Sequence, residues 1–157
     1  MTVDSVVLQP VPLVEEALTC EPGKAAGLIA RFTDAGELDH FSRRYNANDG
    51  FEPLRCVLRH PECDAGTALF IYWQFHELLD DPEARDATRT EPACWNADAL
   101  LIEIEQRYPH DFRHRGITCD PAADCAQVLG EDYVQGIRAR MPGSPLMEPL
   151  VGAADAP

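Results

Sequence analysis

Apolar residues recur at helical spacing through the first half of the chain, and short polar or proline-containing turns separate the runs. Residues three or four positions apart share one face of a helix, so each run predicts a short amphipathic helix. The first three apolar faces are Val11, Val14 and Leu18; Ala25, Leu28, Ile29 and Phe32; and Leu38, Phe41 and Tyr45. Two further patterns follow before residue 80, so we expect five short helices in this half.

The fourth pattern comes directly after a cluster of turn-forming residues at 46–50 (Asn-Ala-Asn-Asp-Gly). Short polar side chains bond to nearby backbone and glycine tolerates positive φ, so this cluster predicts a turn. A helix is expected to begin near Phe51 with Pro53 in its first turn, where a missing amide donor costs nothing. Apolar residues at Phe51, Leu54 and Leu58 form its buried face, and Pro61 ends it.

The fifth pattern, residues 65–79, contains the most apolar run of the chain, Leu-Phe-Ile-Tyr-Trp at 69–73. Asp64 precedes it and is expected to cap the helix, a contribution of about 1 kcal/mol. Five bulky residues in a row cover every side of a helix, which predicts an element buried on most sides. The β-branched and aromatic content also permits a buried strand, but the length and the cap favour a helix.

The second half begins with a polar segment, residues 80–92, which we expect to be a mobile loop. Residues 97–108 then repeat apolar side chains on one helical face, although the local alternation at 99–105 leaves a strand as the alternative. A short extended piece is expected near 115–119. Asp120-Pro121 predicts the start of a last helix, with a break at Gly130.

These elements predict an all-α fold, a single domain over residues 1–145 followed by a flexible tail at 146–157, where Pro, Gly and Ala dominate. Short helices joined by tight turns can stack in the manner of HEAT or armadillo solenoids, each pair burying its face on the next. No fixed-period repeat is visible, so a compact irregular helical domain remains an equal alternative.

The charge of the chain is strongly acidic: 13 basic residues, of which Lys24 is the one lysine, face 27 acidic residues, giving a net charge of −14. Such a field repels nucleic acid and anionic membrane, and favours solubility or a basic partner. Residues 1–9 lack the features of a signal peptide, and no apolar run is long enough for a membrane span. We therefore expect a cytoplasmic protein whose six cysteines are reduced.

Each candidate metal-binding or catalytic motif in the sequence lacks a residue that its chemistry requires. Cys56, His60 and Cys63 could place three soft ligands together, but zinc needs a fourth that the spacing does not supply. His60-Pro61-Glu62 matches the H-x-E of zinc deaminases without their P-C-x-x-C element. His110 and His114 lack the glutamate of a zinc-protease helix. The sequence therefore predicts no catalytic residue, no metal and no cofactor.

Residues 45–73 resemble a bacterial family catalogued as domain of unknown function 4274. The pattern is Tyr-Asn-x-x-Asp-Gly-Phe, then Pro, then Cys-Asp-x-Gly-Thr-Ala-Leu. Here it is carried by Tyr45, Asn46, Asp49, Gly50, Phe51, Pro53, Cys63, Asp64, Gly66, Thr67, Ala68 and Leu69. The chain departs from it at Ala47 and Asn48, where the family usually has Trp and Asp. The resemblance implies a shared fold and no activity, and we expect these residues to be structural.

Three functions remain open. The first is a non-catalytic protein-binding module, specifically an immunity protein that neutralises a basic bacterial toxin, with Asp80, Asp81, Glu83 and Asp86 as the expected partner-binding residues. The second is an enzyme that uses Asp49, Glu52, Asp64 or His60 in a pocket beside the Asn-Asp-Gly turn. The third is a helical scaffold.

Overall fold

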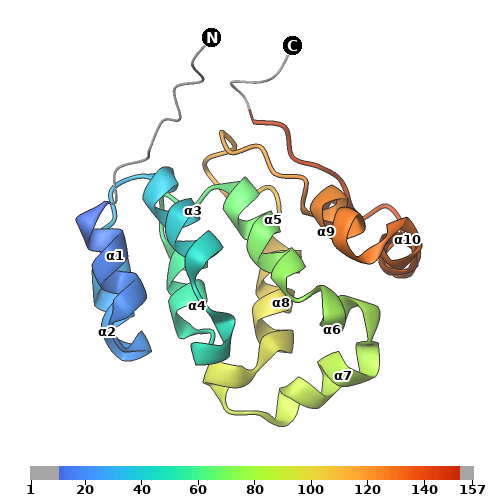
Figure 1. The fold of residues 1–157 in the computed structure, drawn as a ribbon, viewed down its shortest axis with the longest axis horizontal. Coiled ribbons are helices and arrows are strands. Elements are labelled where there is room, and N and C mark those ends of the chain that lie inside the picture. Colours follow the sequence, from blue (N-terminus) through green and yellow to red (C-terminus); the bar gives the residue numbers. More distant parts are fainter. Residues whose placement is uncertain (1–10, 153–157) are drawn as a thin grey trace.

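The computed structural model describes residues 11–152, and within that range it is all-α, with ten α-helices and no named strand (Figure 1). The first half contains α1 (Pro12–Thr19), α2 (Pro22–Ile29), α3 (Ala35–Arg44), α4 (Glu52–Arg59) and α5 (Ala65–Gln74). The second half contains α6 (His76–Asp80), α7 (Pro82–Ala87), α8 (Ala97–Arg107), α9 (Pro121–Leu129) and α10 (Glu131–Arg140). Short 3-10 turns η1 (Ala47–Asp49), η2 (Thr88–Thr90), η3 (Ala93–Trp95) and η4 (Pro145–Met147) lie between or after them.

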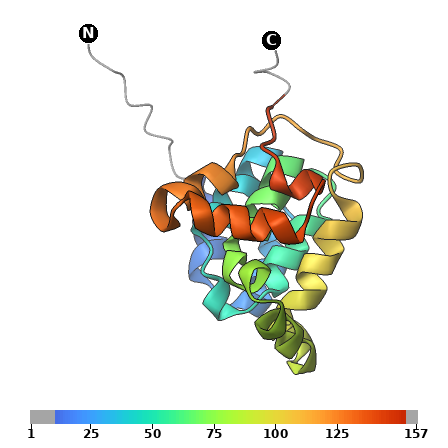
Figure 2. The ribbon, with the colours of Figure 1, turned by 90° about the vertical axis from the view of Figure 1, so that its right-hand side faces the viewer.

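The five helices expected in the first half are confirmed, and they pack in two layers. α1 contacts α3 and α3 contacts α5, while α2 contacts α4 (Figure 1). This order does not continue, because α8 rather than α6 packs beside α5, and α9 and α10 then cross the far end of the molecule (Figure 2). Solenoid-like stacking is therefore not confirmed, and one continuous apolar core runs from Val14 to Met147.

Side-chain caps define most of the predicted helix starts. Asp34 and Glu37 form a reciprocal capping box at the start of α3. Asp64 caps α5, Asn96 caps α8 and Asp120 caps α9, each by accepting a hydrogen bond from a backbone amide of the first turn. The alternative of a strand at 99–105 is thus resolved in favour of a helix, and the break at Gly130 is confirmed by its φ of 95°.

α5 is the central helix, and its side chains at 65–69 and 71–73 are buried. The expected single helix over 65–79 is wrong at its end. Phe75 adopts φ −99° and ψ 26°, its amide bonds to the carbonyl of Tyr72, and its ring packs edge-on against Phe51 with centroids 5.0 Å apart. The chain therefore turns at Phe75, and α6 begins as a separate helix.

The segment after Asp80 is not the mobile loop that we expected. Residues 82–90 form α7 and η2, which pack against each other and against α8. The polar composition misled the prediction because this helix contributes charged rather than apolar side chains to its contact with α8, as described below.

The C-terminal residues pack back onto the domain, so the expected start of a flexible tail at 146 is wrong. Leu146 and Met147 are buried, and the indole Nε1 of Trp73 donates to the carbonyl oxygen of Leu146 at 2.9 Å. Leu150 and Cys119 exchange two backbone hydrogen bonds of 2.8 Å. The extended piece expected near 115–119 is an irregular segment that ends in this isolated bridge. Residues 1–10 and 153–157 lie outside the described residues, and the prediction that residues 1–9 are not a signal peptide concerns this part of the chain.

None of the helices in residues 11–152 has the length and apolarity that crossing a bilayer requires.

Gly66 allows α5 to approach the segment before Cys119 closely. A Cβ atom built on Gly66 would lie 2.3 Å from the carbonyl oxygen of Ile117, whereas one built on Gly27 in α2 would meet nothing within 4 Å. Both glycines are helical. The two positions therefore separate the packing role of a glycine from its helix propensity.

We expect Gly66→Ala to destabilise the fold by about 2 kcal/mol or more, because backbone must shift to relieve the clash. Gly27→Ala should instead stabilise it by about 0.5–1 kcal/mol through helix propensity. Urea unfolding of both variants measures the difference. Equal, small effects would show that α5 and Ile117 are not in close contact.

Candidate functional site

The family-motif residues at 45–51 join three parts of the fold. The hydroxyl of Tyr45 donates to the carbonyl oxygen of Gly50 at 2.8 Å, and Gly50 has a φ of 103°. The amide of Phe51 donates to the carbonyl oxygen of Cys94 at 2.8 Å, and its ring packs edge-on against Trp95. Burial, with a smaller effect of nearby Asp49, raises the pKa of Tyr45 to about 12. These contacts hold η1, α4 and η3 together.

Asp64 is the most connected motif residue, and its side chain is buried at 1% exposure. One carboxylate oxygen accepts from the amide of Gly66 at 2.7 Å, which is the predicted cap. The other accepts from the amides of Gly116 at 2.7 Å and Ile117 at 3.3 Å. Asp64 therefore both caps α5 and fixes the segment 114–117 against it, a tertiary role that the sequence did not reveal.

The remaining motif residues also have structural contacts. Thr67 donates from its hydroxyl to Asp39 of α3 at 3.0 Å, and the Nε of Arg43 donates to the other oxygen of the same carboxylate at 2.7 Å. Cys63 is buried, and burial raises the pKa of its thiol to about 12. Pro53 is buried in the first turn of α4, as expected. Each of these side chains contributes to packing or to helix pairing.

The four residues of the enzyme hypothesis do not converge on one pocket. Asp49 and Glu52 are exposed, whereas the carboxylate of Asp64 is buried and occupied by backbone amides. His60 accepts from the amide of Glu62 through Nδ1 at 3.1 Å and lines a separate cavity between α2 and α4. Within residues 11–152, no three His, Cys, Asp or Glu side chains are grouped so that they could hold a metal ion.

Three of the four expected partner-binding acids have structural contacts. Asp80 pairs with Arg140 at 2.6 Å, Asp81 caps α7 by accepting from two amides at 3.1 Å, and Asp86 pairs with Arg89 at 3.0 Å. Glu83 is exposed on α7. These contacts give three of the acids a structural role, and all four lie on the segment 80–86.

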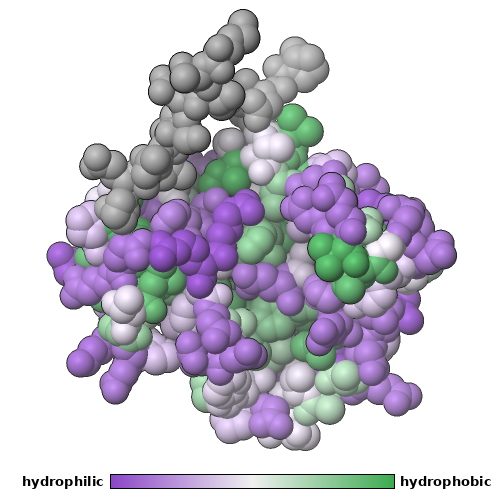
Figure 3. All heavy atoms as spheres, viewed as in Figure 1, coloured by the Kyte–Doolittle hydropathy of each residue, from purple (hydrophilic) through white to green (hydrophobic). Residues whose placement is uncertain are grey.

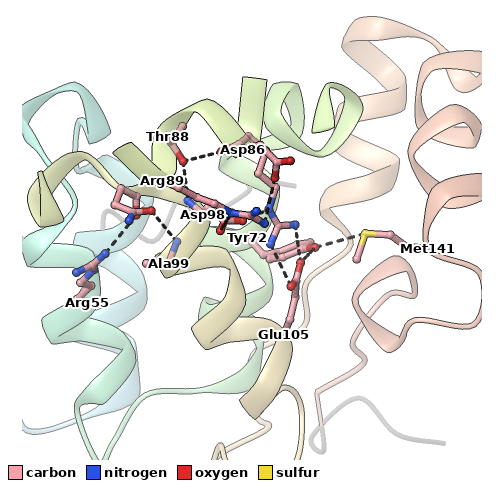
Figure 4. Close-up of polar contacts among 11 residues, drawn as sticks. Arg55, Tyr72, Asp86, Thr88, Arg89, Asp98, Ala99, Glu105 and Met141 are labelled. Atoms are coloured by element: carbon pink, nitrogen blue, oxygen red, sulfur yellow. Dashed lines mark hydrogen bonds and ion pairs between the residues drawn. The ribbon is translucent and has the colours of Figure 1, made fainter. Parts of the chain in front are cut away.

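A network of charges attaches this segment to α8 (Figure 4). Arg85 donates to Asp98 at 2.7 Å and, with two nitrogens, to Glu105 at 2.8 and 3.1 Å. Arg89 donates to the other oxygen of Asp98 at 2.6 Å, and Tyr72 donates to Glu105 at 2.7 Å. Burial alone would raise the pKa of Asp98, but the hydrogen bonds from Arg89 and Arg85 outweigh it and lower that pKa. The network is internally satisfied, which indicates a structural role.

An open apolar groove lies between α5, α6 and α9, with a volume of about 380 Å³. Phe70, Trp73, Pro121, Cys125, Val128 and Leu129 supply its apolar lining, and Gln74, His76, Glu77 and Asp124 its polar lining. Val128 is 82% exposed and Leu129 47%. In Figure 3, hydrophobic side chains gather on the surface near α9, between polar surroundings. We call this feature the α5–α9 groove.

The sequence pattern could have pointed to one wall of this groove. Ala122, Ala126 and Leu129 recur at helical spacing and share one face of the last helix, and the adjacent Val128 lies outside that face, directly before the Gly130 break. Adjacent residues lie about 100° apart around a helix, so Val128 projects away from that apolar face. The opposite wall could not be foreseen, because nothing local places Phe70 and Trp73 beside α9.

Comparison with known families gives one match. Residues 34–109, just under half of the chain, match the family described as Domain of unknown function (DUF4274), and this confirms the resemblance drawn from residues 45–73. No curated protein and no solved structure matches the chain significantly. The matched range contains the motif residues and the charge network of Arg85, Arg89, Asp98, Glu105 and Tyr72, but it ends before the Gly116 and Ile117 amides that Asp64 binds and before α9.

We expect Asp64→Ala to lower the free energy of unfolding by about 3 kcal/mol, because it removes a cap and leaves the amides of 116 and 117 without an acceptor. Asp64→Asn should keep the cap but still lower the free energy of unfolding by about 1 kcal/mol or more. Its NH2 group cannot accept a hydrogen bond, so one of the two groups of backbone amides loses its acceptor. Asp120→Ala, which removes a cap that bonds to Ala123 alone, should cost about 1 kcal/mol. Equal losses for Asp64→Ala and Asp120→Ala would contradict the tertiary role.

The charge network predicts an acid-sensitive contribution to stability. Because the pKa of Asp98 is lowered in the folded state, its contribution is complete above its unfolded pKa and is lost as the pH falls through the folded value. Arg85→Met should cost about 3 kcal/mol at neutral pH and reduce this acid dependence. Arg138→Met, which breaks the 3.5 Å surface pair with Glu131, should cost less than about 1 kcal/mol. Thermal unfolding measured from pH 7 to pH 3 tests this prediction. If both variants had the same stability and the same pH dependence as the parent, the role given to the network would be contradicted.

Proposed function

We propose that this protein is a non-catalytic binding module that captures a basic protein, and that it serves as an immunity protein against a basic bacterial toxin. The observation that carries the proposal is the distribution of charge. Of its 13 Lys and Arg residues, eight form ion pairs with carboxylates within residues 11–152: Arg43, Arg44, Arg59, Arg85, Arg89, Arg107, Arg138 and Arg140. The net charge of −14 is therefore carried by a surface with few unpaired cations.

An unbalanced acidic surface favours fast capture of a basic partner. Complementary charge steers diffusional encounter and raises the association rate more than it raises the affinity of the final complex. The acids of α6 and α7 suit this role: Glu83 is exposed, and Asp86 pairs with Arg89 only across the solvent-exposed surface of the helix. Surface pairs of this kind contribute little to stability, so their carboxylates remain able to attract a partner.

A cytoplasmic location fits the cysteine chemistry. All six cysteines are free thiols, and two of them, Cys63 and Cys119, are buried in the core. The cytosol keeps such thiols reduced, whereas an oxidising compartment selects for disulfides. An immunity protein acting on a toxin inside the cell would work in this environment.

The proposal predicts a salt-sensitive complex. We expect the immobilised protein to retain basic proteins from a lysate of the source organism at low salt and to release them at high salt, because screening weakens charge attraction. A captured toxin should lose its activity when the purified protein is added. Retention of mainly acidic proteins, or a captured basic protein whose activity is unaffected, would contradict the immunity role.

The contribution of the acidic segment can be measured separately. In Glu83→Gln/Asp86→Asn, two exposed charges are removed while the Asp81 cap and the Asp80–Arg140 pair are kept. Its association rate with the captured partner should fall and its salt dependence should become shallower than that of the parent. Glu52→Gln/Asp111→Asn makes the same charge change at exposed positions elsewhere. Equal rates for the two variants would rule out a special role for the α7 acids.

A further inference from the structure

The α5–α9 groove combines an exposed apolar surface with acids that have no cationic partner in the described chain. Val128 and Leu129 leave large aliphatic side chains in water beside Phe70 and Trp73. Contiguous exposed apolar surface rimmed by polar residues is typical of an interaction site. The two acids in its lining, Glu77 and Asp124, are exposed and form no ion pair among residues 11–152.

The surroundings of the groove reinforce its negative character. Burial raises the pKa of the Tyr133 phenol, and nearby Asp80 and Glu77 add to the effect, although Asp80 is itself paired with Arg140 at 2.6 Å. Arg43 stacks on Phe70 with its guanidinium 4.5 Å from the ring centroid, but it is already paired with Asp39 at 2.7 Å. A ligand in the groove therefore meets apolar surface at its centre and carboxylates at its edges.

We propose that the α5–α9 groove is the docking site for an amphipathic helix of the basic partner. An aliphatic or aromatic side chain of that helix would enter between Trp73 and Val128, and flanking Lys or Arg residues would pair with Glu77 and Asp124. Helix-in-groove recognition uses this combination of apolar anchors and rim charges. The inference rests on the proposed function, and it adds the site and the chemistry of the element that the site receives.

The shape and charge favour this occupant over a second copy of the chain. A volume of about 380 Å³ holds a few side chains, not a folded domain, so the bound element must project anchor residues into the groove. Another copy carries the same net charge of −14, which opposes self-association. His76 and Glu77 of α6 line the groove, and α6 leads directly into α7, so a basic partner attracted by the acids of these two helices would arrive near it.

The probe is a synthetic amphipathic helical peptide of leucine and lysine, with a control peptide in which glutamate replaces lysine. Binding to the full-length protein is measured by calorimetry at low and at physiological salt. We expect the lysine peptide to bind and the glutamate peptide not to bind. Val128→Ser/Leu129→Ser should weaken binding at least about tenfold, because the apolar anchor loses its contact. Val151→Ser, at another exposed valine, should leave the affinity unchanged.

A matched pair tests the rim charges. Glu77→Gln/Asp124→Asn should weaken binding roughly threefold or more, beyond the effect of Glu52→Gln/Asp111→Asn, which changes the net charge equally but lies outside the groove. All four substituted acids are exposed, so the variants should stay folded, which circular dichroism confirms.

The possible outcomes distinguish a failure of the groove assignment from a failure of the proposed function. If the lysine peptide binds but both charge variants weaken it equally and Val128→Ser/Leu129→Ser has no effect, the acidic surface attracts basic ligands and the groove assignment is wrong. If the peptide does not bind while a basic partner is captured, the groove is also wrong and the proposed function stands. Concentration-dependent dimerisation that Val128→Ser/Leu129→Ser abolishes would identify a second copy as the occupant. If the groove binds the peptide but no basic protein is captured, the site is real and the immunity role fails.

Discussion

The arrangement of the second half of the chain depends on the hydrogen bonds that the buried carboxylate of Asp64 accepts. It satisfies the first turn of α5 with one oxygen and the backbone of 116–117 with the other. Gly66 permits the close approach that this requires. Cys119 then bonds to the backbone of Leu150, and the hydroxyl of Thr118 accepts from the amide of Gly152. Because α9 follows directly after Cys119, the position of the α5–α9 groove depends on this joint.

The residues that carry the family resemblance accordingly make structural contacts. Tyr45, Gly50 and Phe51 fix one end of α4 to η3, while Asp64, Gly66 and Thr67 fix α5 to its neighbours. None of these requires a ligand. The α5–α9 groove lies partly outside the matched residues 34–109, because one of its walls is on α9.

The parts of the fold that could be predicted from the sequence are those with local causes. Asp64, Asn96 and Asp120 cap helices, and apolar periodicity located α1–α5, α8 and α9, because capping and periodicity act within a few residues. The errors have non-local causes. Residues 82–90 pack against α8 because Arg85 and Arg89 pair with Asp98. Leu146 is held on the domain because its carbonyl oxygen accepts from the indole of Trp73. The groove itself required α5 and α9, far apart in sequence, to be placed side by side.

Amide hydrogen exchange at residues 116 and 117 tests the central claim most directly. Gly116 and Ile117 lie in an irregular segment, where amides ordinarily exchange fast, yet their amides donate to a buried carboxylate. We predict that both exchange only through the opening that also releases the amides of α5, and so show the same protection as Gly66. Exchange at 116 and 117 as fast as at exposed Arg113, while α5 stays protected, would contradict the role given to Asp64.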